Sequence, residues 1–107
     1  MQGGIAEAHI QNCTITGNSN AGVWVVGAPG STNVATVSNS LIVSNNFGIY
    51  TDPSAANIVR LTGNTISRNS IGVVVNPGAV VKSAGDNVID GNTTIDVSGS
   101  MTSITKR

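Results

Sequence analysis

A repeat of 23 to 27 residues is the feature that most limits how this chain of 107 residues can fold. Each copy holds an isoleucine and, three residues later, an asparagine, and the successive isoleucines are 27, 24 and 23 residues apart. The four pairs are Ile15 with Asn18, Ile42 with Asn45, Ile66 with Asn69, and Ile89 with Asn92. A period of this length is typical of solenoids, in which each copy forms one turn and packs only against its neighbours.

The composition indicates that each copy consists of strands. Val and Ile together number 25 against two Leu, and Gly, Asn, Ser and Thr make up 49 of the 107 residues. β-Branched side chains suit a pleated strand, whereas Gly and Asn tolerate the left-handed backbone of tight turns. Apolar pairs also precede the isoleucine in three copies: Ala8 and Ile10, Ala35 and Val37, Val59 and Leu61. The pattern therefore predicts that each copy forms three short strands.

Three short strands cannot enclose a core, so stacked copies must supply it, each strand pairing in parallel with its equivalent in the next turn. We expect an all-β fold: a parallel β-helix solenoid of about four turns with three short strands per turn. It would form one domain over residues 1–107. The expected repeats lie at about 5–32, 33–55, 56–81 and 82–98, with a C-terminal strand or cap over 99–107.

A β-sandwich is the alternative architecture, because it also shows strands every 8 to 12 residues or so. A sandwich, however, gives no reason to repeat one isoleucine-to-asparagine spacing four times. Leucine-rich repeats do not fit a chain with two leucines, and no period of six suggests a left-handed β-helix. The repeated register thus favours the solenoid.

The pattern N-x-x-I-x-x-N followed by G-[VI]-x-V resembles the repeats of right-handed parallel β-helix proteins of the pectate-lyase-like superfamily. These repeats are shared by polysaccharide lyases, epimerases and NosD-type periplasmic proteins. The resemblance covers about residues 5–98. It implies a right-handed coil, a carbohydrate-binding or carbohydrate-processing role, and a secreted or cell-surface location. The motif residues turn corners and fill the core, so the resemblance describes the fold more closely than the function.

Stacking predicts columns of equivalent residues, and strand alternation decides which columns face inward. The expected core columns are Ile15, Ile42, Ile66 and Ile89; Val23, Ile49, Val73 and Ile95; and Ile10, Val37 and Leu61. The expected asparagine ladder at a bend of the coil is Asn18, Asn45, Asn69 and Asn92. Stacked amides of this kind bond along the column and to backbone groups that the strands leave unpaired.

Trp24 and Tyr50 are the strongest candidates for ligand binding. They fall in one outward column on neighbouring turns, so their strands should lie about 5 Å apart. Such a pair suits a platform for sugar rings; the structural alternative is that it fastens adjacent strands together or lies under the loop 27–32. Insertions at 27–32 and 52–55 would wall a groove on that side. Arg60, which falls outward in a column with His9 and Thr36, is a further ligand-binding candidate by residue type.

The low and balanced charge of the chain argues against several classes of partner. Charged residues make up 9% of the chain, with five basic residues against five acidic ones. We therefore expect no nucleic-acid partner and no membrane partner, because both need a basic face. The acids are sparse and no two fall side by side, so no catalytic residues, no metal site and no cofactor are expected.

The favoured function is a non-catalytic module that binds polysaccharide. No capping helix is evident at the ends of the coil, so we expect homo-oligomers formed through exposed solenoid ends. One alternative is a fragment of a polysaccharide lyase, hydrolase or epimerase whose active site lies on absent turns. The other is an assembly element of a surface fibre.

Overall fold

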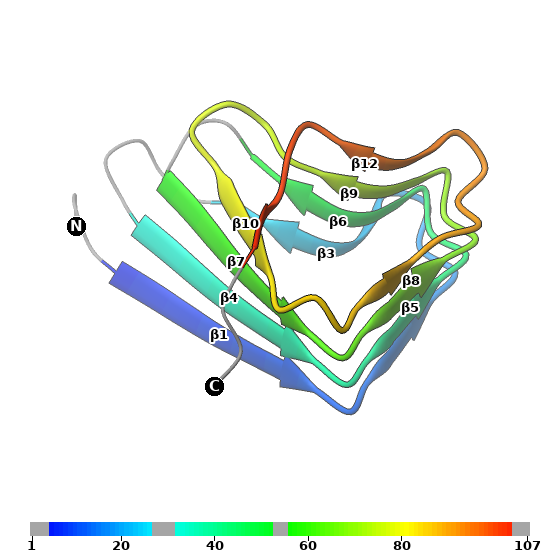
Figure 1. Cartoon of the computed structure of the whole chain (residues 1–107), viewed down its shortest axis with the longest axis horizontal. Helices are drawn as coiled ribbons and strands as arrows, with labels where there is room; N and C mark the ends of the chain where they lie inside the picture. Colours follow the sequence, from blue (N-terminus) through cyan, green and yellow to red (C-terminus); the bar gives the residue numbers. More distant parts are fainter. Residues whose placement is uncertain (1–4, 27–31, 53–55, 104–107) are drawn as a thin grey trace.

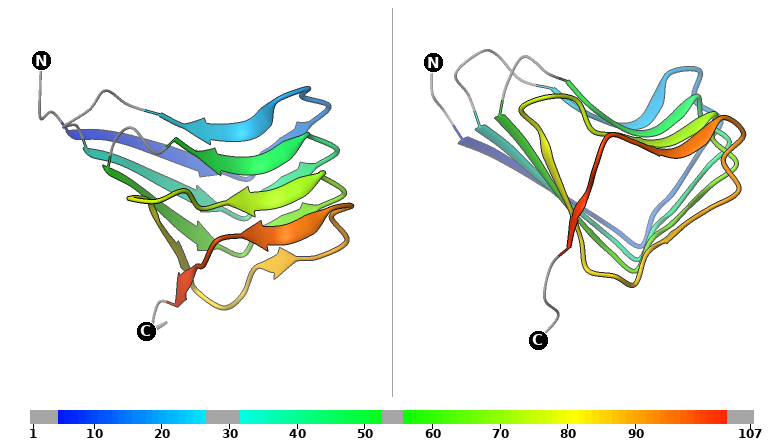
Figure 2. Two further views of the ribbon diagram at one scale, coloured as in Figure 1. Left: turned by 90° about the horizontal axis from the view of Figure 1, so that it is seen from above. Right: turned by 45° about the horizontal axis from the view of Figure 1, so that its top comes forward.

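The computed structural model describes residues 5–26, 32–52 and 56–103. These residues form thirteen β-strands and no helix, and so none that could cross a bilayer. The strands wind into a coil whose turns lie one above the other (Figures 1 and 2). The prediction of an all-β parallel solenoid with about four turns and three strands per turn is confirmed.

Equivalent strands of successive turns form three parallel sheets, which we label A, B and C. Sheet A holds β1 (Ile5–Gln11), β4 (Thr32–Ser38), β7 (Ala56–Thr62), β10 (Val80–Ser83) and β13 (Thr102–Ser103). Sheet B holds β2 (Thr14–Thr16), β5 (Leu41–Val43), β8 (Thr65–Ser67) and β11 (Val88–Ile89). Sheet C holds β3 (Ala21–Val25), β6 (Phe47–Thr51), β9 (Ile71–Val74) and β12 (Ile95–Ser98). The sheets are the sides of a roughly triangular cross-section (Figure 1).

The core lies inside the triangle and is built from columns of β-branched residues. Pairing puts Ile15 beside Ile42, Ile42 beside Ile66, and Ile66 beside Ile89. The fully buried apolar residues are Val37, Ile42, Ile49, Val59, Leu61, Ile66, Val73 and Val81. At the ends of the isoleucine column, Ile15 and Ile89 are only partly buried, because each has a turn on one side alone.

The prediction that Ile95 joins the core is wrong. Strand β12 pairs with β9 so that Ile95 lies beside Ile71, while Val97 takes the place beside Val73. Ile95 is accordingly 45% exposed. Ile95 therefore stands in the column of Ile71 and Phe47, not in the core column of Val73 and Ile49. The segment between Asn92 and the residue that pairs with Val73 is therefore longer than the sequence repeat suggested, because that residue is Val97 and not Ile95.

The asparagine column between sheets B and C is a continuous hydrogen-bonded ladder. The Oδ1 atom of Asn69 accepts from the backbone N–H of Asn45 at 3.0 Å and from its Nδ2 at 3.1 Å. The same pattern links Asn18 to Asn45 and Asn69 to Asn92. The Nδ2 of Asn69 also donates to the carbonyl of Ile42. The ladder therefore satisfies backbone groups at a corner that the sheets leave unpaired.

A second polar ladder, which the sequence analysis missed, runs along the corner between sheets A and B. The backbone N–H of Ser40 donates to Oδ1 of Asn64, and that of Asn64 donates to Oδ1 of Asn87. The N–H of Cys13 donates to the hydroxyl of Ser40. In all four turns this position lies two residues before the core isoleucine. The repeat thus carries a polar column on each side of that isoleucine.

Both ladders end in the fourth turn on a residue of that same turn. Asp96 Oδ1 accepts from the backbone N–H and from Nδ2 of Asn92, at 3.1 and 2.9 Å. The hydroxyl of Ser83 accepts from Nδ2 of Asn87 at 3.0 Å. Asp96 therefore does for Asn92 what an asparagine of a further turn would do, and Ser83 accepts the side-chain donor of Asn87.

Gly48 is a position where a side chain would collide with the next turn. A Cβ there would contact the carbonyl oxygen of Gly72 and lie 2.9 Å from a methyl group of Ile66. We expect Gly48→Ala to lower the free energy of unfolding by about 3 kcal/mol, because backbone must move to admit the methyl group. Gly22→Ala, whose Cβ would lie no nearer than 3.0 Å to its neighbours, is the graded control. Equal losses in urea unfolding would contradict the close approach at Gly48.

Candidate functional site

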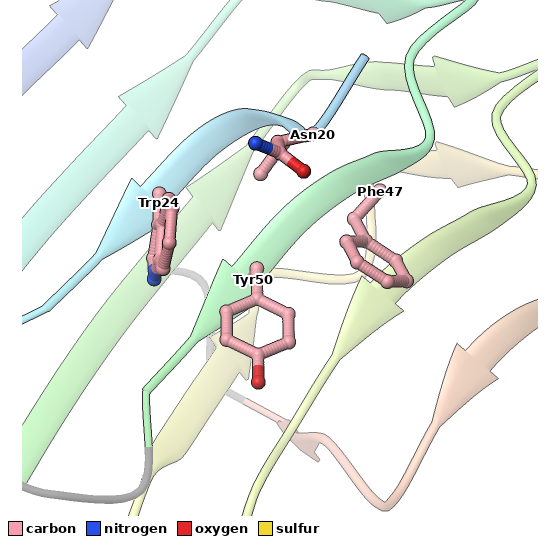
Figure 3. Close-up of a pocket in the computed structure, with 5 residues that line it drawn as sticks. Asn20, Trp24, Phe47 and Tyr50 are labelled. Carbon is pink, nitrogen blue, oxygen red and sulfur yellow. The ribbon is translucent and has the colours of Figure 1, made fainter. Parts of the chain in front are cut away.

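The three aromatic residues of the chain gather on the outer face of sheet C (Figure 3). Trp24 on β3 pairs with Tyr50 on β6, and their ring centroids are 5.8 Å apart with ring planes at 85°. Phe47 lies beside Tyr50, with centroids 5.3 Å apart and planes at 37°. Sheet pairing thus brings Trp24 and Tyr50 together, as their spacing suggested.

Phe47 belongs to this group because the alternation of β6 breaks at Gly48. The absent side chain of Gly48 would point at interior atoms of Ile66 and Asn69, and Ile49 is fully buried. Two consecutive residues thus face inward, which leaves Phe47 and Tyr50 on the same outer face although they are three residues apart. A regular strand would have placed them on opposite faces.

The rings surround a hollow of about 240 Å³ that Asn20 and Ala21 complete. The backbone N–H of Phe47 donates to the carbonyl of Asn20 at 2.9 Å, which fixes Asn20 beside the ring. Trp24 is 53% exposed, the other two rings are half-buried, and Asn20 is exposed. Figure 3 shows the rings and the Asn20 amide arranged around this hollow.

The two rings of the expected platform do not lie in one plane. Rings at 85° cannot present one continuous plane, so Trp24 and Tyr50 form two sides of an angle. Apolar C–H groups of a ligand can pack on these faces, while the Asn20 amide and the Tyr50 hydroxyl offer hydrogen bonds. The volume is smaller than the roughly 300 Å³ at which ordinary ligand pockets begin. The hollow suits one ring of a ligand with mixed apolar and hydroxyl character.

Arg60 lies away from this hollow. It is exposed on β7 in sheet A, between Thr36 of β4 and Lys82 of β10. The structure therefore brings Trp24 and Tyr50 together, adds Phe47 and Asn20, and leaves Arg60 on another sheet. Residues 27–31 and 53–55, which were expected to help wall a groove, lie outside the described residues.

Two of the five acidic residues hold the coil together. Asp96 closes the asparagine ladder, and Asp86 Oδ1 accepts from the backbone N–H of Gly63 at 2.9 Å. In the described ranges, no group of three or more His, Cys, Asp or Glu side chains lies close enough to hold a metal ion.

Comparison with known proteins gives one finding, which concerns the fold family. The family model described as right-handed beta helix region matches residues 2–106. No curated protein and no solved structure matches the chain. The match spans nearly the whole sequence and agrees with the stacked turns of parallel strands.

Proposed function

Because this chain belongs to the right-handed β-helix family, we propose that it is a non-catalytic β-helix module that binds carbohydrate in the aromatic hollow of sheet C. The observation that carries the proposal is the convergence of all three aromatic side chains on one exposed hollow. Aromatic rings on a solvated surface expose apolar area to water. A ligand bound in the hollow would remove that area from water.

The chemistry of the hollow supports a neutral sugar. Its lining residues are Asn20, Ala21, Trp24, Phe47 and Tyr50, none of which carries a charge at neutral pH. A uronate or a sulfated sugar would place its anionic group in the hollow, where no lining residue is a cation that could pair with it. A neutral pyranose instead offers C–H groups for the rings and hydroxyls for Asn20 and Tyr50. A secreted or cell-surface location would bring the module to such polysaccharides.

Trp24→Ala should weaken binding to a neutral oligosaccharide at least tenfold, because it removes the most exposed ring of the hollow. Ligands would first be identified on a glycan array that includes neutral and acidic sugars, and affinities then measured by titration calorimetry. Val88→Ala is the matched control, since Val88 is equally exposed on the outer face of sheet B. Equal affinity of wild type and Trp24→Ala would refute the site.

Two other functions make different predictions in the same experiments. A fragment of a lyase, hydrolase or epimerase predicts altered products after incubation with polysaccharide, and a lyase in particular predicts unsaturated sugars. A surface-fibre element predicts no binding to any glycan on the array. We favour the binding module over both because of the aromatic hollow.

A further inference from the structure

The two ends of the coil differ. At the C-terminal end, β13 pairs with β10 and Met101 packs against the core, so the chain crosses over its own last turn (Figure 2). The donors of both ladders end there on Asp96 and Ser83. The described part of this chain therefore covers the C-terminal end at sheet A, while β11 and β12 remain edge strands.

The N-terminal end has none of these devices among the described residues. Strands β1, β2 and β3 each lie at the edge of a sheet, with a partner strand on one side only. Ala8 is exposed, whereas Ala35, its paired residue one turn on, is 4% exposed. A hollow of about 230 Å³ opens beside the apolar residues Ala8, Ile10, Val23 and Val25. Unpaired edges beside the exposed Ala8 and the half-buried Ile10 make a surface that can add strands.

We propose that two copies of this chain associate end to end through their first turns, around a two-fold axis perpendicular to the coil. The axis passes through the centre of β1 and through the opposite corner of the triangle. Each β1 then pairs antiparallel with the partner's β1, and sheets B and C of one copy meet C and B of the other. This proposal is independent of carbohydrate binding.

Hydrogen-bonding complementarity along β1 supports a second copy as the occupant. The central residue of this seven-residue strand is Ala8, and the exposed residues on either side are Glu7 and His9. An antiparallel pairing centred on Ala8 places Glu7 opposite the partner's His9, and does so twice by symmetry. Opposite-charge and hydrogen-bonding pairs at such positions favour the pairing, and an imidazole N–H can donate to a carboxylate.

The same axis brings the open ends of two asparagine ladders together. Asn18 lies at the corner between sheets B and C, opposite sheet A, and it is exposed. Its Nδ2 and backbone N–H donate to Asn45, while its Oδ1 receives no hydrogen bond from a described residue. Two such amides facing each other can form a reciprocal pair, because each keeps one N–H and one oxygen free. An independent corner of the face thus agrees with the axis that β1 suggests.

The two-fold contact itself limits this association to two copies. A two-fold contact uses the same patch on both subunits and closes the assembly. The expected particle has twice the 10.8 kDa of the chain. This differs from the fibre-like growth that two open ends would allow.

Sedimentation velocity over micromolar concentrations tests the pairing. Wild type should sediment as a dimer, and Glu7→Lys should raise the dissociation constant at least tenfold, because a lysine then faces the partner's His9. The double variant Glu7→Lys with His9→Glu places a lysine opposite the partner's glutamate and should recover most of the affinity. Asp90→Lys, an equal charge change at an exposed site on the fourth turn, is the control.

Disulfide trapping provides a second readout that does not depend on affinity. In a Cys13→Ser background, Asn18→Cys should form a covalent dimer on mild oxidation, whereas Asp90→Cys should not. A monomer at all concentrations, growth beyond the dimer, or cross-linking through position 90 but not position 18 would each overturn the proposal. Normal circular dichroism of each variant would exclude misfolding as the cause.

Discussion

Asn69→Ala is expected to lower the free energy of unfolding by about 3 to 5 kcal/mol, because several buried polar groups lose their partner together. Asn69 is fully buried. Its removal leaves the backbone N–H of Asn45 without its side-chain acceptor, and takes one acceptor from Nδ2 of Asn45 and one donor from the carbonyl of Ile42. Each buried group left unsatisfied costs about 1 to 3 kcal/mol.

Asn18→Ala provides the matched control for the ladder. Asn18 is the same residue type in the same column, but it is exposed and no described residue donates to its Oδ1. Its replacement should cost about 1 kcal/mol or less in urea unfolding of the monomer. Comparable losses for the two variants would show that the column does not act as a ladder with a buried middle and an open end.

Ile66→Ala is expected to cost about 2 to 5 kcal/mol, because it leaves a cavity in the middle of the isoleucine column. Ile66 is fully buried between Ile42 and Ile89. Ile95→Ala should cost less than about 1.5 kcal/mol, since the side chain is 45% exposed and its loss opens no enclosed space. Both changes remove the same atoms from an isoleucine in a strand.

Chemical unfolding of the two isoleucine variants also decides the register of the fourth turn. If Ile95 faced the core beside Val73, the two losses would be similar. A large loss for Ile95→Ala and a small one for Val97→Ala would contradict the pairing of Val97 with Val73.

The repeat spacing was sufficient to predict the core of the first three turns. Each of Ile15, Ile42 and Ile66 lies three residues before an asparagine, and stacking aligns them without further information. The same alignment predicted that Trp24 and Tyr50 pair across neighbouring strands. Columns are predictable because a fixed period and parallel pairing leave one register for equivalent residues.

The fourth turn was mispredicted where the repeat loses its glycine. Gly72 allows close approach to the next turn, which presents Asp96 there. The sequence analysis placed Ile95 in the core column of Val23, Ile49 and Val73. Asp96 instead points its carboxylate at Asn92 and closes the ladder, and Val97 takes the place beside Val73. In the last turn Asp96 takes the place that a glycine has in the earlier turns, although the two residues have no similarity in sequence.

Phe47 and the second polar ladder were missed for different reasons. Phe47 reaches the outer face only through the break in alternation at Gly48, and sequence period gives no sign of such a break. The ladder of Ser40, Asn64 and Asn87 could have been found, since each lies two residues before a core isoleucine. The column was hard to recognise because its first member, Cys13, is neither a serine nor an asparagine and contributes its backbone N–H.

A strand or cap was expected at the C-terminal end of the coil over residues 99–107, and no capping helix was expected at the N-terminal end. The segment expected as a strand or cap after residue 98 forms β13 and inserts Met101 against the core. Residues 104–107 of that segment lie outside the described residues. Met101 is a single apolar residue in a polar stretch that does not repeat the pattern of the earlier turns. The repeat therefore could not predict that Met101 packs against the core.

Nuclear Overhauser effects between isoleucine methyl groups test the stacked coil most directly. Parallel stacking in this register predicts contacts from Ile15 to Ile42, from Ile42 to Ile66 and from Ile66 to Ile89, in that order. It also predicts contacts from Ile95 to Ile71. Short Hα–Hα contacts typical of antiparallel hairpins between neighbouring strands, or contacts from Ile66 to Ile15 without Ile42 between them, would contradict the coil.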